Sequence, residues 1–365
     1  MKILYITPTI NTEGGLERVL SIKTNYFIER FGYQIEVITC NNGFQNSFFN
    51  FNSKIKFHDI LLNSNKLGNL INYKVKIQKL INLINPDCIV ICDFGLKGFS
   101  FPILFNNKVP IVFEAHGSIY NESQYYKVNF FSRNARKLKY EYKKFCSKKF
   151  DHFVVLSNES LKEWPVVNYE IIPNPNMGSD LISDLTAKNV ILIARHSHEK
   201  GLDFALKIWK KVSQTHPDWT LSIFGKKDEQ NTYINLAKQL QIESKVRFYE
   251  PVKEIQTKYC EASISIMTSR SEGFPMALIE AMTCGLPVVA FDCPIGPRSI
   301  ITNEEDGFLI ETFNCDAFAS RIIQLIENES LRKEIGLQAK KSVSKYDIDK
   351  VMLQWNAFFE KITSR

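Results

Sequence analysis

The chain has 365 residues, of which 44% are hydrophobic, and this is typical of a globular protein with room for two folded domains. It contains no low-complexity tract, no detectable internal repeat and no uncharged apolar run long enough to span a bilayer. The first ten residues, Met1-Lys2 and eight strand-like residues, are too few for the apolar region of a signal peptide. The formal net charge is +7, from 46 Lys and Arg against 39 Asp and Glu.

The positive charge is concentrated in the first half of the chain. Residues 1–180 carry 22 Lys and Arg against 15 Asp and Glu, whereas the remainder is balanced at 24 against 24. Nine of the basic residues fall within 127–149, where Glu141 is the only acid, and apolar residues recur there at spacings of four and three. This pattern predicts an amphipathic basic helix.

Two interpretations of the basic helix remain open. It could be a solvated helix docked on its own domain, or it could contact an anionic surface such as phospholipid headgroups or a phosphate-bearing lipid substrate. Nucleic acid is disfavoured because no recognition motif accompanies the charge. The candidate membrane or acceptor contacts are Arg133, Arg136, Lys137, Lys143 and Lys144.

The eight cysteines lie mostly within apolar segments and form no C-x-x-C pair. This usage predicts reduced thiols in a cytosolic protein rather than a disulfide framework. We therefore expect a cytoplasmic protein, attached peripherally at the inner face of the cell membrane if the basic helix contacts lipid.

Short apolar strands alternate with helices in the first half of the chain, which argues for right-handed βαβ units and a parallel sheet. The helices are predicted over Leu16–Arg30 and Leu67–Ile84. The predicted strands are Lys2–Ile10, Gln34–Thr39, Ile55–Ile60, Cys88–Cys92, Ile111–Phe113 and Phe153–Leu156.

A second series of strands follows a segment rich in proline, asparagine and serine at residues 173–188, which is typical of a domain boundary. Its predicted strands are Val190–Ala194, Thr220–Phe224, Val246–Tyr249, Ser263–Met267 and Val288–Phe291. The last helix, about 347–362, has no strand after it, and we assign it to the first domain. The prediction is an α/β protein with two doubly wound, Rossmann-like domains facing a central cleft: residues 1–178 plus 346–365 for the acceptor, and residues 179–345 for the donor.

The segment 269–292 reads as loop, helix and buried strand, after an apolar strand that ends at Met267. Pro275 stands where a helix can begin, because proline fixes φ and needs no donor in the first turn. Glu272 lies in the loop and Glu280 on the helix, with seven residues between them. Such carboxylates could hold the hydroxyls of a polar ligand in the crevice at the carboxyl ends of the strands. The plainer alternatives are a solvated loop acid for Glu272 and a lone salt bridge for Glu280.

Three other loops carry candidate residues. Gly14-Gly15 follows the first strand and precedes a helix, so its backbone N–H groups could approach a phosphate, although a plain tight turn fits as well. Arg195 and Lys200 follow the first strand of the second half and could clamp a diphosphate. His116 ends a strand of the first half and either caps the sheet or faces a cleft. We predict no metal site, since the pair His196 and His198 has no third ligand nearby.

Together these segments resemble the GT-B glycosyltransferases of family 4. The residues that carry the resemblance are Gly14-Gly15-Leu16-Glu17-Arg18, Ile172-Pro173-Asn174-Pro175, Arg195 with Lys200-Gly201, Ser271-Glu272-Gly273-Phe274-Pro275 and Glu280-Ala281. Glu272 and Glu280 match the E-x7-E pattern of that family. The segments 292–298 and 306–309 look like the bacterial branch that builds surface polysaccharides. The resemblance spans nearly the whole chain, apart from residues 41–67 and the basic helix.

The resemblance implies transfer of a sugar from a nucleoside-diphosphate sugar, with retention and without a bound metal or other cofactor. Arg195 and Lys200 would hold the diphosphate and stabilise the charge that develops on it, with help from the Gly15 N–H. Glu272 would bind hydroxyls of the donor sugar, in the loop that also contains Gly273, Phe274 and Pro275, and Glu280 would bind the ribose diol. His116 would lie beside the transferred sugar. No carboxylate is placed as a nucleophile, which favours a front-face transfer over a covalent intermediate.

The branch suggests a UDP-sugar donor carrying glucose, galactose or their N-acetyl forms, and a saccharide acceptor that is lipid-linked. A nucleotide-sugar epimerase on the same architecture and a non-catalytic sugar- or lipid-binding partner subunit remain as alternatives. A dinucleotide-dependent oxidoreductase is disfavoured because the G-x-G-x-x-G fingerprint and its ribose-binding acid are missing.

Overall fold

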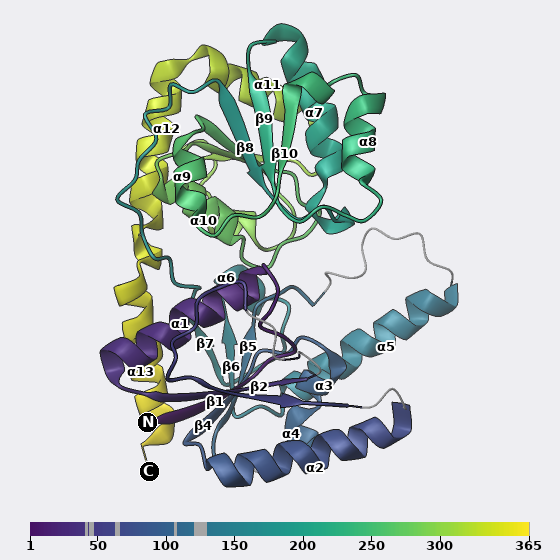
Figure 1. Ribbon diagram of the computed structural model, residues 1–365, viewed down its shortest axis with the longest axis vertical. Helices are drawn as coiled ribbons and strands as arrows, with labels where there is room; N and C mark the ends of the chain where they lie inside the picture. The colour runs from purple at the N-terminus through teal and green to yellow at the C-terminus, as the bar shows by residue number, and fades with distance from the viewer. Residues whose placement is uncertain (41–42, 44–46, 63–65, 106–107, 120–129, 365) are drawn as a thin grey trace. The chain divides into compact units, whose positions relative to one another are not determined.

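The computed structural model describes residues 1–40, 43, 47–62, 66–105, 108–119 and 130–364 (Figure 1). The chain forms two compact units, one made of Met1–Pro175 together with Ile348–Arg365, and the other of Asn176–Asp347. The division falls close to the boundary predicted from the proline-rich segment. The last helix, α13 (Ile348–Thr363), belongs to the first unit.

The first unit is built on a parallel seven-stranded sheet with the strand order β3-β2-β1-β4-β5-β6-β7. Its strands are β1 (Lys2–Ile6), β2 (Gln34–Cys40), β3 (Lys56–Ile60), β4 (Cys88–Ile91), β5 (Ile111–Ala115), β6 (His152–Val155) and β7 (Tyr169–Ile171). The order reverses between β1 and β4, and the carboxyl ends of the strands at such a switch point are where open α/β sheets bind ligands.

Helices cover both faces of this sheet (Figure 1). They are α1 (Gly15–Phe31), α2 (Lys66–Ile84), α3 (Leu96–Phe99), α4 (Phe101–Leu104), α5 (Phe130–Ser147) and α6 (Asn158–Leu161), together with α13. One hydrophobic core joins α1 and α13 to the sheet, through residues such as Phe27 and Trp355. A second core joins α2, α3, α4 and α5 to the other face, through residues such as Tyr73, Phe99 and Tyr140.

The second unit contains a parallel six-stranded sheet with the order β10-β9-β8-β11-β12-β13, so its switch point lies between β8 and β11. Its strands are β8 (Asn189–Ile193), β9 (Thr220–Phe224), β10 (Val246–Tyr249), β11 (Ile264–Met267), β12 (Val288–Phe291) and β13 (Phe308–Ile310). Its helices are α7 (Leu202–Thr215), α8 (Thr232–Gln239), α9 (Ile255–Cys260), α10 (Met276–Thr283), α11 (Cys315–Glu327) and α12 (Glu329–Ser342). Short 3₁₀ turns occur at His198–Lys200, Glu243–Lys245, Pro297–Ser299 and Val343–Tyr346.

The predicted strands all occur, with small changes at their ends. β1 ends at Ile6 rather than at Ile10, because Pro8 lacks the N–H that a central strand needs for its ladder. The sequence did not predict β7 and β13, which have three residues each and extend the two sheets at one edge. Among the described residues, no helix combines the length and apolar character that a bilayer crossing requires.

Candidate active site

The loop between β11 and α10 places Glu272 beside the switch point of the second sheet. Glu272 Oε1 accepts hydrogen bonds from Lys200 Nζ at 2.7 Å and from Ser269 Oγ at 2.6 Å. The Lys200 and Glu272 side chains are 23% and 12% exposed, so both are partly accessible to a ligand. Two residues that the sequence singled out separately, 72 positions apart, therefore form an ion pair.

Gly201 explains how the Lys200 loop packs against the end of β11. Its φ is +63°, and a Cβ at this position would lie 2.0 Å from the backbone oxygen of Thr268. Only glycine fits there without strain or displacement of the backbone. The Thr268 hydroxyl then donates to the Gly201 carbonyl oxygen at 3.0 Å, which ties the two loops together at the point where Lys200 meets Glu272.

Arg270, which was not among the residues predicted from the sequence, connects the same two loops. Its guanidinium binds both carboxylate oxygens of Asp203 at 2.8 and 2.7 Å and donates to the His198 carbonyl oxygen at 2.6 Å. Its backbone N–H donates to the Glu199 carbonyl oxygen at 2.8 Å. A buried bidentate arginine is a rigid connection, so Arg270 fixes the loop that presents Lys200. The sequence feature that could have indicated Arg270 is its position between Ser269 and Ser271, in the loop that carries Glu272.

Arg195 lies on the same loop as Lys200 but is more exposed. Its side chain is 56% exposed, and its guanidinium is 3.4 Å from Glu199 Oε1, a long contact for an ion pair. The structure therefore brings Lys200 and Glu272 into direct contact, while Arg195 projects from the loop toward solvent. A loosely held guanidinium retains the freedom to bind a diphosphate.

Helix α10 begins where Pro275 predicts, with Pro275 as its N-cap at a φ of −75°. Phe274 is buried and packs edge to face against Tyr346, with ring centroids 5.4 Å apart. Glu280 is buried on α10 among apolar neighbours. A Cβ at Gly296 would lie 2.6 Å from the Glu272 Cβ, so this glycine permits the backbone of the 292–298 segment to approach Glu272.

The predicted phosphate-binding turn of the first unit lies at the N-terminus of α1. Gly14 is the N-cap, and a Cβ there would lie 2.3 Å from Glu17 Oε2, so a larger residue would require the Glu17 carboxylate to move. Glu17 is buried, and its Oε1 accepts a hydrogen bond from the Thr12 hydroxyl at 2.6 Å. A Cβ at Gly15 would meet nothing within 4 Å, which leaves this backbone position open to approach.

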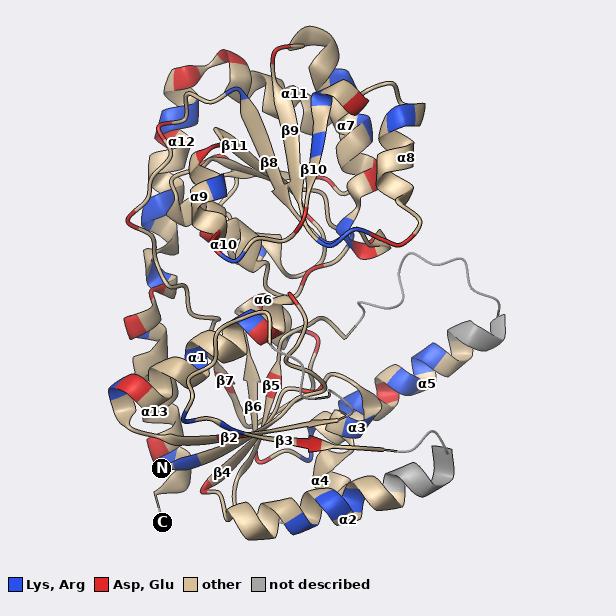
Figure 2. Cartoon of the chain, viewed as in Figure 1, with Lys and Arg blue, Asp and Glu red and all other residues tan. Residues whose placement is uncertain are grey.

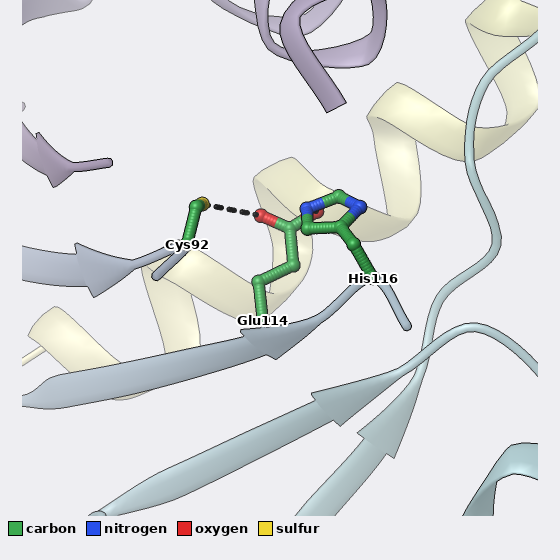
Figure 3. A group of neighbouring side chains, drawn as sticks. All are labelled: Cys92, Glu114 and His116. Atoms are coloured by element: carbon green, nitrogen blue, oxygen red, sulfur yellow. Dashed lines mark hydrogen bonds and ion pairs between the residues drawn. The ribbon is translucent and has the colours of Figure 1, made fainter. Parts of the chain in front are cut away.

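His116 follows β5 and contacts a buried polar cluster (Figure 3). Its Nε2 is 3.2 Å from Glu114 Oε1, the same oxygen that accepts a 2.5 Å hydrogen bond from Lys23 Nζ. Cys92 Sγ donates to Glu114 Oε2 at 3.6 Å. Burial alone would raise the pKa of Glu114, but the Lys23 ammonium and His116 outweigh it and hold that pKa at about 2.

Cys92, Glu114 and His116 lie close enough together to suggest metal ligands, but their chemistry does not fit a dication. The Lys23 ammonium already binds Glu114 and would repel a second cation. Burial raises the pKa of the Cys92 thiol, and the nearby carboxylate raises it further, whereas metal binding requires the thiolate. The cluster is therefore an ion pair with two hydrogen-bonded neighbours.

The basic helix α5 turns its apolar stripe outward. Leu138 and Phe145 are 72% and 54% exposed, and Tyr142 between them is also exposed. The opposite side of the helix, with Tyr140 and Cys146, packs into the core of the first unit. The helix is therefore docked on its own domain through Tyr140 and Cys146, as one of the two interpretations expected, while Leu138 and Phe145 face outward.

The candidate contact residues on α5 divide by exposure. Lys137 is exposed, Arg136 is partly buried, and Lys144 is partly buried with its Nζ 3.9 Å from Glu141. Lys143 does not belong to the outward surface, because its side chain is buried and its ammonium lies 4.9 Å from the centre of the Phe94 ring. The prediction for Lys143 is corrected accordingly. The side chain of Arg133 lies outside the described residues.

The fold and the loops at the second switch point define a class of protein. Residues 179–342 match the family described as glycosyl transferases group 1. Solved structures with the same fold include sucrose-phosphate synthase of Thermosynechococcus elongatus, with a TM-score of 0.80 and 16% identity over 99% of both chains. Another is Alr3699/HepE of Anabaena in complex with UDP-glucose, with a TM-score of 0.79 and 18% identity over 99% of this chain and 100% of that one. The chain has the GT-B fold, with two parallel-sheet α/β domains.

Curated relatives that align along the whole chain are glycosyltransferases. An uncharacterized glycosyltransferase of Haemophilus influenzae is 29% identical over 97% of this chain and 98% of its own. The amylovoran biosynthesis glycosyltransferase AmsD of Erwinia amylovora is 27% identical over the same shares of the two chains. The family match and these relatives support a GT-B glycosyltransferase, and the name of one of the relatives assigns it to amylovoran biosynthesis.

Proposed function

We propose that this chain is a retaining, metal-independent glycosyltransferase of the GT-B type, family 4. It moves a hexose or N-acetylhexosamine from a UDP-sugar to a saccharide acceptor, which is lipid-linked, in the synthesis of surface polysaccharide or glycolipid. The observation that carries the proposal is the Lys200–Glu272 pair at the second switch point, held by Gly201 and Arg270. A cation beside a carboxylate suits the junction of a diphosphate with a polyhydroxylated sugar.

The cations act on the leaving group. When the bond between the anomeric carbon and the diphosphate breaks, its electron pair moves onto the phosphate oxygen, and negative charge grows there. Lys200 and Arg195 stabilise that charge in the transition state, so they accelerate the reaction rather than only bind the donor. The Gly15 N–H adds a backbone donor to the same phosphates. In this mechanism the two side chains take the part that a divalent ion plays elsewhere, and no cofactor is required.

The acceptor hydroxyl attacks the anomeric carbon from the face that the diphosphate leaves. Its proton passes to the departing phosphate oxygen, which balances the step and retains the configuration. The carboxylate of Glu272 orients the hydroxyls of the donor sugar, Glu280 binds the ribose diol, and His116 lies beside the transferred sugar. Gly273, Phe274 and Pro275 shape the loop that carries Glu272.

Uridine as the base is supported by relatives whose structures contain UDP or UDP-glucose. A thermal-shift panel tests this assignment, because a ligand that binds the native state stabilises it, and at equal concentration a tighter ligand stabilises it more. We expect UDP and UDP-hexoses to raise Tm more than ADP or GDP, and we expect the shift to persist in EDTA. A shift that requires magnesium would contradict the metal-independent mechanism, and no shift with any nucleotide would contradict donor binding.

Retention is tested by the product. With UDP-α-glucose as donor and membrane-extracted lipid-linked saccharide as acceptor, the small anomeric proton coupling of an α-glycoside is the expected result. A large coupling would identify an inverting enzyme. The comparisons with glycosyltransferases do not favour the epimerase or the non-catalytic partner. An epimerase would give an altered UDP-sugar without a glycoside, and a non-catalytic subunit would not release UDP from the donor even slowly.

The acceptor side of the proposal concerns the helical layer of α2 and α5, which covers one face of the first sheet. Figure 2 shows Lys and Arg along both helices. The sequence of α2 contains four lysines and no acid, and its exposed apolar residues Ile71, Val75 and Leu83 lie along one side. Exposed apolar side chains among lysines are typical of a helix that lies at an anionic membrane surface. We therefore place peripheral contact with anionic lipid on this layer.

Vesicle binding tests the membrane contact. Reversal of Lys137, Lys144, Lys148 and Lys149 to Glu should release the protein from phosphatidylglycerol vesicles and leave UDP binding intact. The matched control reverses four exposed lysines of the second unit and should not release it. These are Lys238, Lys253, Lys333 and Lys341. Equal binding by the two variants would contradict a contact through α5.

A further inference from the structure

The ion pair of Lys23 and Glu114 lies inside the first unit, with both side chains 1% exposed. Lys23 comes from α1, and Glu114 comes from the fourth position of β5, 91 residues further along the chain. Removal of two charges from water is costly, and such a pair adds little net stability compared with apolar residues of the same size. We therefore ask which neighbouring side chains the ion pair positions.

Glu114 is surrounded by donors. Its Oε1 contacts Lys23 Nζ and His116 Nε2, and its Oε2 accepts from Cys92 Sγ. Tyr5 of β1 is a further titratable group close to this carboxylate, and burial raises the pKa of its hydroxyl. An ionised carboxylate can only accept hydrogen bonds, so in its neutral form the His116 ring carries its hydrogen on Nε2. Nδ1 is then the acceptor nitrogen of a ring whose side chain is 13% exposed.

Trp355 completes the arrangement from the end of the chain. The Lys23 ammonium lies 3.5 Å from the centre of the Trp355 ring on α13, a close cation–π contact between two buried side chains. Trp355 is itself fully buried. Helices α1 and α13 therefore hold Lys23, Lys23 holds Glu114, and Glu114 holds the His116 ring.

We propose that Glu114 is a positioning residue that fixes His116 as the Nε2–H tautomer, and that Lys23 and Trp355 hold Glu114 for this task. The proposal rests on the proposed function, in which His116 lies beside the transferred sugar. The fixed tautomer presents Nδ1 as a hydrogen-bond acceptor to a sugar hydroxyl. The same ring with the hydrogen on Nδ1 would present a donor instead, and the sugar hydroxyl would then be held less well for reaction. Misplacement of a reacting group can slow turnover by about 10²-fold.

The ¹⁵N spectrum of the His116 ring tests the tautomer without any activity measurement. Because a lone substitution of Glu114 leaves the Lys23 charge buried and unpaired, the informative variant is Glu114→Gln combined with Lys23→Met, which carries no buried charge. The Gln amide can either donate or accept, so it no longer restricts the ring to Nε2–H, and we expect the Nδ1–H tautomer to become populated. The Cys92→Ala control, which leaves Oε1 untouched, should keep the wild-type spectrum.

Turnover provides the second measurement. With saturating UDP-glucose, we expect kcat for UDP release to fall about 10- to 100-fold in the double variant, with KM unchanged. The single variant Trp355→Phe keeps Glu114, Lys23 and an aromatic ring over the ammonium. It should show the wild-type spectrum and most of the wild-type rate. An unshifted tautomer in the double variant would overturn the proposal. Normal turnover of His116→Ala would instead overturn the proposed role of His116 and leave the spectroscopic result standing.

Discussion

Each unit places one lysine against one glutamate near the carboxyl ends of its strands, and the two pairs differ in burial. Lys200 and Glu272 lie on loops of the second unit and remain partly exposed. Lys23 and Glu114 lie between a helix and a strand of the first unit, where water does not reach them. Their separations are similar, at 2.7 and 2.5 Å, so the distance between the charges does not distinguish the two pairs.

Because the two pairs differ in burial, we expect one to bind a ligand and the other to affect the stability of the fold. A partly exposed pair keeps access to solvent and can exchange one partner for a ligand, and it contributes little to stability. A fully buried pair cannot reach a ligand, but the loss of one partner leaves the other charge unpaired at a large cost. The same substitution should therefore affect catalysis in the second unit and folding in the first.

The largest effect should come from Lys23→Met. It leaves Glu114 buried without its ammonium, which should lower the free energy of unfolding by about 3–5 kcal/mol. Urea denaturation followed by circular dichroism measures this change. The matched variant Lys200→Met, at the partly exposed pair, should lose less than about 1 kcal/mol. Equal losses from both variants would remove the distinction between the pairs.

Lys200→Met should have the second largest effect, on turnover rather than stability. Loss of a preorganised charge at the leaving group should lower kcat for donor cleavage by about 10²- to 10³-fold. Arg195→Ala should also lose most of its turnover, since the guanidinium is proposed to hold the same diphosphate. Steady-state kinetics at saturating UDP-sugar gives both values. Lys238→Met, at an exposed lysine on α8, serves as the control and should be normal.

Acid should weaken the first unit through Glu114. Its pKa is about 2 in the folded protein and near 4.5 when unpaired, so its contribution to stability is present above about pH 4.5 and is lost as the pH falls toward 2. Burial lowers the pKa of the Lys23 ammonium, while the attraction of Glu114 opposes this shift. Between pH 5 and 2, the free energy of unfolding should therefore fall more steeply for the wild type than for the Glu114→Gln and Lys23→Met double variant. The difference in slope corresponds to about one additional proton bound when the wild type unfolds. Parallel curves would contradict the assignment.

The smallest effect should come from Arg270→Lys. An ammonium cannot reproduce the bidentate contact with Asp203, so we expect a loss of about 1–2 kcal/mol in stability and a few-fold rise in KM for the donor. Arg298→Lys is the matched control, because Arg298 also binds both carboxylate oxygens of an aspartate, Asp292, through its Nε and Nη2 at the surface. The surface variant should lose less than about 0.5 kcal/mol. A larger loss from it would show that burial does not set the strength of these contacts.

Local features of the fold could be predicted from the sequence. Pro275 predicts the start of α10, and the Cys284-Gly285 pair predicts its end, where Gly285 has a φ of +78°. Apolar runs and their spacing predicted the longer strands of both sheets. The three-residue strands β7 and β13 could not be predicted, because their pairing at the sheet edges depends on neighbours distant in sequence. The pairing of Lys23 with Glu114 depends on tertiary contacts in the same way.

The basic helix α5 is a case in which the spacing of apolar residues predicts a helix but not its orientation on the domain. The spacing of Leu138, Tyr142 and Phe145 predicts one apolar side but not whether that side packs on the domain or faces outward. Contact between α5 and α3 decides the matter by burying the side that contains Tyr140 and Lys143. Lys143 is tolerated there because its ammonium lies over the rings of Phe94 and Phe99.

The return of α13 to the first unit has a consequence for synthesis on the ribosome. All of Asn176–Asp347 leaves the exit tunnel before the helix that carries Trp355 does. The second unit can therefore reach its native state early, while the first cannot cover the Lys23 ammonium with its aromatic ring until α13 has been synthesised. Any chaperone that attends this nascent chain should bind the part that was made first.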